Sequence, residues 1–456
     1  MKNLKNNVVL SYKHIVFSAW LLMAVFPLSV VAQTTTISVK SEAAPTVVTL
    51  ETCRQWALGH NEQIKAAGIA ERKAELDRQI AYTHYLPQVD GAAATIVSKD
   101  NDLMGMKLQM RGAWLAGINI VEPLYAGGQI TTGNRLAAMA QDMAVLQSRR
   151  TRADVLADVD KAYYTLISVH GKVRMLEAYQ ELMKGLYEQV NRSVNAQLAT
   201  ANDLLRIESK QTEISYQLQK AKNGETICQL ALANAVGADL GTQLTPKDTV
   251  LTIAAPTHLD ENLSQRPELQ MLQKTIGIRE QQVRMARAGM LPTVALALGY
   301  TQYGNIKMKG SVQALDGNYY PFTQKFNGNM PMAMLTVKVP IFHWGAELKK
   351  VKKAQLDVDN ARLALQQNER GMRIEVRQSV QNLTDGYRMT ETAMKGLEQA
   401  KENLRVMRQK YNNQMATMTD LLDAQSQWQQ ARSNLIEAQT QYKIYETEYL
   451  KATGRL

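Results

Sequence analysis

The segment VEPLYAGGQITTGNR, Val121–Arg135, joins two different kinds of sequence. The residues before it, Met110–Val121, alternate between apolar side chains and small or polar ones, which is typical of a β-strand with one apolar face. The residues after it contain no proline from Leu124 to Thr245. Because proline breaks helix interiors, this stretch is free to form long helices. The pair of glycines between the two parts predicts a sharp turn from strand into helix.

The same junction occurs a second time as KVPIFHWGAELKKV, Lys338–Val351. A constant spacing of 217 residues relates Pro123 to Pro340 and continues along the chain, so that 123–237 and 340–454 are two copies of one unit. A repeat of this kind indicates one structural unit that is used twice. We therefore expect a duplicated order of helix, β-hairpin, long helix and returning helix.

The predicted helices are long. Gln129–Leu198 would extend over roughly 105 Å as one helix, and apolar residues recur in it every seven residues, as in a coiled coil. Two shorter helices, Asn61–Leu86 and Asp203–Val236, together nearly match its length. The second copy repeats this pattern with Pro267–Leu291 and Asp420–Thr453. One long helix that pairs with two stacked short helices is the simplest arrangement that buries these apolar seams.

Two hairpins, at about 88–121 and about 293–339, contain four segments of the length found in membrane-barrel strands. Four strands cannot close a barrel, and lipid does not tolerate an open sheet edge. If these strands enter a membrane, several chains must share one barrel, which predicts a homo-oligomer. A hairpin that packs on a soluble core would show the same alternation.

The composition limits the classes of function. Residues 1–32 combine three lysines, an apolar run and small residues, as a secretory signal peptide does. The basic residues that follow are scattered among acids and glutamines, which indicates solvated helix surfaces and no nucleic-acid partner. Cys53 and Cys228 are too few for a disulfide framework, although one bridge between them is compatible with the sequence.

The sequence contains no catalytic constellation. Its six histidines are spread out without a second ligand at metal spacing, and no nucleophile motif occurs. We therefore expect no enzyme activity, no cofactor and no metal site. Two Met-rich segments, Met104–Met110 and Met330–Met334, could offer thioether ligands to Cu(I), but adaptable packing is the preferred interpretation of these methionines.

Taken together, the motifs resemble those of the TolC-type outer membrane efflux proteins, and the resemblance covers essentially the whole chain after residue 32. It depends on the order and spacing of LPQV at 86–89, VEPLYAGGQ at 121–129, LPTV at 291–294, VPIFHWGAE at 339–347 and YNNQMATMTDLLDAQ at 411–425. The resemblance implies a mainly α protein with a β-barrel part. It implies a homotrimer that shares a twelve-stranded barrel in the outer membrane lipid of a Gram-negative bacterium. An α-helical tunnel would continue through the periplasm to an adaptor protein and an inner-membrane pump.

The resemblance also divides the chain. Residues 1–32 would be the signal peptide, 33–60 an N-terminal periplasmic segment, 61–237 the first repeat, 238–265 an equatorial linker and 266–456 the second repeat. Proline lacks the donor that a strand ladder needs, so each junction proline is expected to close its strand, and aromatic rings suit a membrane interface. The barrel–tunnel junction would consist of Pro123, Tyr125, Gly127, Gly128, Pro340, Phe342 and Gly345.

A periplasmic gate is implied at the tips, where each long helix turns into its returning helix. Three-fold symmetry would arrange Asp420 and Asp423 as six carboxylates around a narrow opening, while Tyr411 and Asp203 would tie the closed state. Asp420 could instead cap its helix, as Asp203 could at the equivalent place. Asp423 aligns with Arg206 in the first copy and is therefore the better candidate for gate-specific chemistry.

The tips depart from the family pattern at three positions. Ala416 stands where the family has a basic residue, and Gln197 and Gln414 stand where glycine is usual. An adaptor would dock at the tips, the parts furthest from the membrane. The docking residues would be Gln197, Leu198, Ala199, Thr200, Gln414, Met415, Ala416 and Thr417.

These features predict a passive outer membrane channel of a tripartite efflux or type I secretion system, which opens when an adaptor and a pump engage its tips. The alternative is a secreted or surface coiled-coil protein with a structural or adhesive role and no pore. This alternative accounts for export and for the seven-residue repeats, but it leaves the two strand-length hairpins unexplained.

Overall fold

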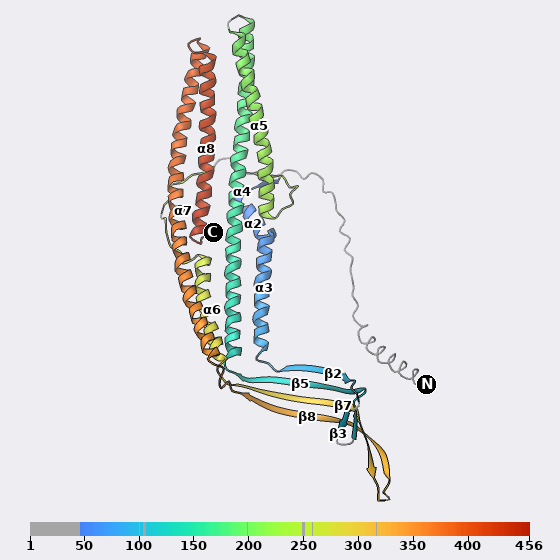
Figure 1. Cartoon of the computed structure of the whole chain (residues 1–456). Coiled ribbons are helices and arrows are strands. Elements are labelled where there is room, and N and C mark those ends of the chain that lie inside the picture. Colours follow the sequence, from blue (N-terminus) through green and yellow to red (C-terminus); the bar gives the residue numbers. More distant parts are fainter. Residues whose placement is uncertain are drawn as a thin grey trace, which may run out of the picture. The chain divides into compact units, whose positions relative to one another are not determined.

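A computed structural model describes residues 46–99, 101–103, 106–197, 199–248, 251–257, 259–315 and 317–456. The predicted signal peptide, 1–32, lies outside the described residues. The described chain is mainly helical with one large antiparallel sheet, as the sequence predicts. Figure 1 shows the helices lying side by side, with the sheet at one end of them.

The first half of the chain is organised around one long helix. α4 (Gln129–Asn195) is a continuous helix of 67 residues, roughly 100 Å long. It contacts α3 (Glu62–Thr83) and α5 (Ala201–Val236), while α2 (Leu50–His60) packs against both α4 and α5. The expected pairing of the long helix with two shorter ones is therefore present (Figure 1).

The second half has the same organisation. α7 (Ala346–Asn412) also contains 67 residues, and it contacts α6 (Pro267–Ala288) and α8 (Met418–Ala452). α4 contacts α6 and α8 as well, so the two halves are packed against each other along their length. Among the described residues, no helix has the length and the apolar composition needed to cross a membrane.

The sheet has four long strands in the order β2, β5, β7, β8, and every neighbouring pair is antiparallel. The β5–β7 ladder joins the two halves of the chain. Two short strands, β3 and β4, continue the sheet along the outer part of β7, and a separate parallel pair is formed by β1 and β6. The strands are β1 (Thr46–Val48), β2 (Gln88–Ile96), β3 (Asn101–Leu103), β4 (Met106–Gln109), β5 (Ala113–Ala126), β6 (Leu244–Pro246), β7 (Thr293–Gln313) and β8 (Tyr319–Lys338).

The expected end of the first hairpin was wrong, because β5 continues to Ala126, past residue 121. The second hairpin, expected at about 293–339, contains β7 and β8 and runs from Thr293 to Lys338. Within β7, a bulge between Tyr303 and Ile306 adds one residue against β8. A bulge breaks the two-residue period in the sequence while the hydrogen-bonded ladder continues.

Buried apolar side chains form separate clusters along the helix contacts. One cluster surrounds α2 and the middle of α4 and includes Cys53, Val159 and Tyr163. Another lies near the tips and combines Tyr179 and Met183 of α4 with residues of α5 and α8. Cys53 and Cys228 are both free thiols, and burial raises the pKa of Cys53 to about 12. The two thiols therefore act as packing groups in this structure.

Candidate functional site: junction, sheet and helical tips

The junction between sheet and helices depends on left-handed backbone. Gly127 and Gly128 have φ of 59° and 82°, and Gly345 has φ of 73°. Gly128 and Gly345 are the N-caps of α4 and α7. A Cβ atom on Gly127 would lie 2.7 Å from the carbonyl oxygen of Ala288, so this position also needs glycine for space. Glycine tolerates such φ values because it has no Cβ.

The junction prolines differ from each other. Pro340 lies just after β8, as expected. Pro123 does not close its strand, because the ladder continues through Tyr125 opposite Val294 and Ala126 opposite Thr293. The strand continues past Pro123 because the register shifts between Pro123 and Tyr125. Such a bulge lets a strand accommodate a residue that has no amide donor.

Aromatic side chains are exposed at the same level. Tyr125 is 48% exposed, Phe342 67% and Trp344 85%. The rings of Phe342 and Trp344 contact each other with their centroids 5.0 Å apart. Large exposed aromatic rings at one end of a sheet suit the boundary between hydrocarbon and water.

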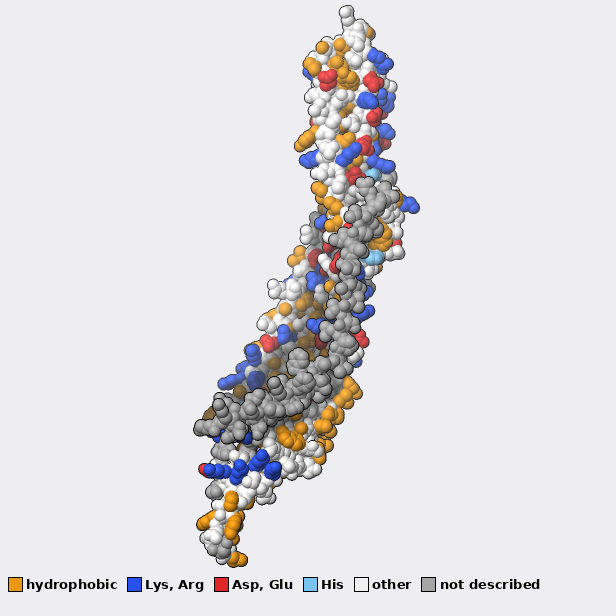
Figure 2. Space-filling view, turned by 90° about the vertical axis from the view of Figure 1, so that its right-hand side faces the viewer, with side chains coloured by type: hydrophobic (Ala, Val, Ile, Leu, Met, Phe, Trp, Pro, Cys, Tyr) orange, Lys and Arg blue, Asp and Glu red, His pale blue; other side chains and the backbone are white. Residues whose placement is uncertain are grey.

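The two faces of the sheet differ in chemistry. Residues that pair across strands share a face, so the row Val89, Ile120, Leu298 lies on one face. The next row, Asp90, Asn119, Gly299 and Met332, lies on the other. Hydrophobic side chains gather on this part of the molecule in Figure 2. The first face is apolar and largely exposed, and its members include Val89, Trp114, Ile118, Leu298, Tyr300, Leu335 and Val337.

At the tips, Asp203 and Asp420 are held as helix caps. The carboxylate of Asp420 accepts from the amide and the hydroxyl of Thr417 at 2.9 and 2.7 Å, and Thr417 accepts from the amide of Asp420 in return. Thr200 and Asp203 form the same capping box in the first copy. The bonds from Thr417 lower the pKa of Asp420. These contacts match the capping alternative for both acids.

The remaining two gate candidates lie nearby. Tyr411 packs on the tip cluster with Leu204 and Leu422, and its pKa is raised by burial and then by the charge of Asp203. Tyr411 therefore lies near enough to Asp203 to feel its charge, and a tie between the two residues stays a prediction. Asp423 is exposed and makes no ion pair with the residues that the structure describes.

One tip contact was missed from the sequence. Arg206 of α5 donates from Nη1 to Oγ1 of Thr419 at the start of α8. It thus supplies a basic link between the two tips, while Ala416 carries no charge. The alignment of Arg206 with Asp423 was visible in the sequence, but a contact between residues 213 positions apart has no local signal.

The tip turns show why glycine is usual there. Gln197 and Gln414 both have φ of 59°, in the left-handed region that side chains other than glycine rarely adopt. Ala416 is partly buried and Met415 is 75% exposed. Leu198, another predicted docking residue, lies outside the described residues.

Residues 54–238 and 258–455 match the profile of a family described as "Outer membrane efflux protein". This match covers most of the chain. The chain belongs to the outer membrane efflux protein family. It is therefore an outer membrane protein of a Gram-negative bacterium that extends into the periplasm, and members of its family are channels rather than enzymes.

Individual relatives agree with this assignment. The efflux protein is 23% identical over 411 residues to Protein CyaE of Bordetella pertussis, covering 88% of this chain and 82% of that protein. It is 22% identical to outer membrane protein TolC of Escherichia coli, covering 87% and 81%. Among solved structures, CusC superposes with a TM-score of 0.73 at 15% identity, covering 91% of this chain and 95% of that one. The likeness to CusC shows the fold.

Midway along the helices, the efflux protein has a buried polar cluster that the sequence did not reveal. Asp160 of α4 is fully buried and accepts from Nε of Arg54 in α2 at 2.8 Å. Its other oxygen accepts from Oγ1 of Thr447 in α8 at 2.9 Å. The cluster therefore ties both halves of the chain to the N-terminal helix. Its members are 106 and 287 positions apart from Asp160, so no spacing rule could have found them.

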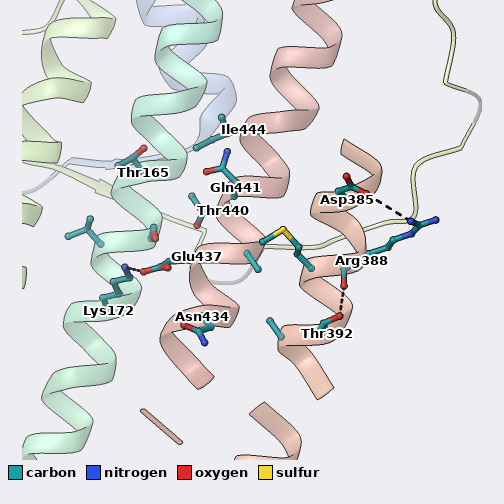
Figure 3. A pocket seen from close by; sticks show the side chains of 15 residues that line it. Thr165, Lys172, Asp385, Arg388, Thr392, Asn434, Glu437, Thr440, Gln441 and Ile444 are labelled. Carbon is teal, nitrogen blue, oxygen red and sulfur yellow. Dashed lines mark hydrogen bonds and ion pairs between the residues drawn. The ribbon is translucent and has the colours of Figure 1, made fainter. Parts of the chain in front are cut away.

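A groove of about 970 Å³ lies beside this cluster, between α4, α7 and α8 (Figure 3). An ion pair between Lys172 and Glu437 crosses it, and Asp385 contacts Arg388 on its far wall. Oγ1 of Thr440 is buried in its wall without a hydrogen-bond partner among the described residues. The groove thus opens between the two halves of the efflux protein, which the Lys172–Glu437 ion pair still joins at this level.

Proposed function

We propose that this protein is the outer membrane channel of a tripartite efflux or type I secretion system, and that three copies share one barrel. The observation that carries the proposal is the four-stranded sheet with one apolar, exposed face. Among the described residues β2 pairs only with β5, and β8 pairs along its length only with β7, so the sheet has two open edges. Lipid does not tolerate open edges, and three such sheets joined β8 to β2 make a closed barrel of twelve strands.

The helices would form the periplasmic tunnel. α4 and α7 each continue from a strand through a left-handed glycine, so that three chains would place six long helices below the barrel. In the proposed arrangement, 61–237 and 266–456 are the two repeats, 238–265 the equatorial linker, and 33–60 the N-terminal periplasmic segment. A signal peptide at 1–32 would direct the chain across the inner membrane.

The tips would be the gate and the docking surface for the adaptor and the pump. The contacts of Tyr411 with the tip cluster and of Arg206 with Thr419 support a closed state held by links between the first and second copies. Asp423 would line the opening, while Asp203 and Asp420 hold the turns as caps. The channel would be passive, and an adaptor would open it by binding the open tips more tightly than the closed ones.

A planar bilayer experiment tests the proposal. The purified protein should have the mass of a trimer in detergent and should give discrete single-channel conductance steps. One relative, PrtF of Dickeya chrysanthemi, is named a proteases secretion protein, which supports the secretion branch of the proposal. A monomeric or dimeric mass together with silent bilayers would overturn the channel and favour the coiled-coil alternative.

A further inference from the structure

Four lysines gather on one face of the sheet, beyond its apolar part. Lys107 of β4 lies directly opposite Lys309 of β7, and Lys307 of β7 lies directly opposite Lys325 of β8. Like charges that face each other across strands destabilise a sheet. None of the four has an acidic partner within salt-bridge distance among the described residues. A bound anion would account for two such pairs side by side.

The lysines lie on the face that the channel would turn to lipid. β8 has no inserted residue in its ladder, so its odd-numbered residues share one face from Val337 and Leu335 to Lys325. Lys307 and Lys309 face Lys325 and Thr323 across the ladder, and Lys107 faces Lys309. All four ammonium groups therefore stand on the same side as the apolar face.

The position of the four lysines along the strands matches the lipid headgroup layer of a membrane. Trp114 lies on the apolar face, is 44% exposed, and pairs with Gly304 of β7. Tryptophan at the edge of an apolar face marks a membrane interface. Lys307 and Lys309 follow Gly304 by three and five residues, which is roughly 10 to 17 Å along the strand. Figure 2 shows a band of Lys and Arg side chains across this end of the sheet, just before the hairpin tip.

We propose that Lys107, Lys307, Lys309 and Lys325 bind the phosphorylated headgroup of a glycolipid of the lipid A type in the outer leaflet. This inference rests on the proposed channel function. Ammonium groups match phosphate in charge, and the apolar side chains of the same face, which begin beyond the polar pair Gln302 and Asn329, would hold the acyl chains of the same molecule. A soluble anion would use only the lysines. Asp102 lies directly opposite Lys107, so one carboxylate stands at the β3 side of the four lysines.

The test measures retention of lipid A by the full-length protein in detergent, by native mass spectrometry with titrated lipid. Bisphosphorylated lipid A should bind more tightly than a dephosphorylated form, and inorganic phosphate at millimolar concentration should not displace it. The variant Lys107→Gln, Lys307→Gln, Lys309→Gln, Lys325→Gln should lose affinity by roughly fivefold for each lysine removed. If the fourfold variant does not fold, two double variants replace it: Lys107→Gln with Lys309→Gln, and Lys307→Gln with Lys325→Gln.

A matched control removes the same charge elsewhere. Lys184, Lys220, Lys395 and Lys401 are exposed on the helices, and their replacement by glutamine should leave lipid retention within twofold of the starting protein. The lipid site is overturned if the fourfold Lys→Gln variant binds lipid A as tightly as the starting protein does. It is also overturned if the dephosphorylated lipid binds as tightly as the bisphosphorylated one. Single-channel conductance of the same samples separates the two proposals. If the fourfold variant shows normal conductance and unchanged lipid retention, only the lipid-site proposal is rejected. If the starting protein gives no conductance in bilayers, the channel proposal is rejected.

Discussion

Asp203 and Asp420 show how a single hydrogen-bond geometry changes the interpretation of a residue. Asp420 stands where a ring of carboxylates could line a gate and Asp203 where it could tie the closed state. Both acids direct their carboxylates onto the threonine at the start of their helix, Thr417 and Thr200. Each acid then serves the first turn of its own helix, where a negative charge also suits the helix dipole. Asp423, one turn further on and without such a partner, is left as the acid that can face the opening.

Replacing Thr417 with alanine should loosen the first turn of α8. Loss of an N-cap of this type favours local opening by roughly fivefold, which hydrogen exchange at the amides of 418–421 would report. Thr200→Ala should act on α5 alone and provides the control.

The pH dependence of the same cap has a definite sign. The pKa of Asp420 is lowered in the folded protein, so its contribution is complete above the ordinary carboxyl pKa and is lost as the pH falls through the lowered value. Protection at 418–421, corrected for intrinsic exchange, should therefore be equal at pH 7 and pH 5.5. A clear loss of protection between these two values would contradict the capping role of Asp420.

At the scale of the elements, polar contacts at several heights join the helices of the two halves. Near the tips, Arg206 links α5 to α8 through Thr419. At mid-height, Asp160 links α4 to α2 and α8. Between these points Lys172 pairs with Glu437 beside the groove, and Gln429 of α8 donates to Gln217 of α5. Different contacts therefore hold the tips and the middle of the helices.

Arg206→Ala should make the closed channel leak. Removing one charged hydrogen bond between the tips should raise the open population by roughly fivefold, measured as open probability in a planar bilayer without an adaptor. Arg206→Lys keeps a positive charge at this position and should raise the open probability less than Arg206→Ala does. Lys210→Ala is the control, because Lys210 pairs with Glu213 on its own helix. Equal open probability for Arg206→Ala and Lys210→Ala would exclude Arg206 from gating.

Asp160→Asn should weaken the fold itself. Arg54 would lose its carboxylate partner in a partly buried site, and breaking such a pair costs about 2–4 kcal/mol. The midpoint of thermal unfolding, followed by circular dichroism, should fall by several degrees. Asp154→Asn provides the comparison, because Asp154 pairs with Lys451 at the surface. A similar midpoint for both variants would show that the buried cluster does not support the helix contacts.

At the scale of the whole molecule, the two open sheet edges and the repeat together define how copies would meet. The ladder of β5 with β7 places Ile120 opposite Leu298. The spacing of 217 residues relates Ile120 to Val337 of β8. The spacing of 205 residues, which relates LPQV at 86–89 to LPTV at 291–294, relates Leu298 back to Ala93 of β2. Val337 and Ala93 are therefore the equivalent pair between neighbouring copies. Both residues lie on the apolar face, as a shared register requires.

A cysteine cross-link tests this contact between copies. With Cys53 and Cys228 replaced by serine, the pair Ala93→Cys, Val337→Cys should give covalent trimers on a denaturing gel after mild oxidation. Shifting one partner by four residues, as in Ala93→Cys, Ala333→Cys, should abolish the cross-link, because the two sites would then be roughly 13 Å apart along the strand. Monomers from the first pair would contradict the shared barrel.

Local sequence was sufficient to predict the elements that depend on neighbours along the chain. Proline-free stretches predicted α4 and α7, with a seven-residue period in α4, and the glycine pair Gly127–Gly128 and the single Gly345 predicted the turns, because helix formation and backbone freedom are local properties. Strand limits were less certain, since the bulge after Tyr303 interrupts the alternation on which such predictions depend.

Contacts between distant residues became visible only in the folded chain. The cluster around Asp160, the link from Arg206 to Thr419, and the lysine pairs across β4, β7 and β8 all join positions that lie far apart in the chain. The folded chain also showed that the carboxylate of Asp420 bonds Thr417 as a helix cap, which depends on the direction of the side chain. Side-chain direction is set by packing and hydrogen bonds in three dimensions, which no local pattern encodes.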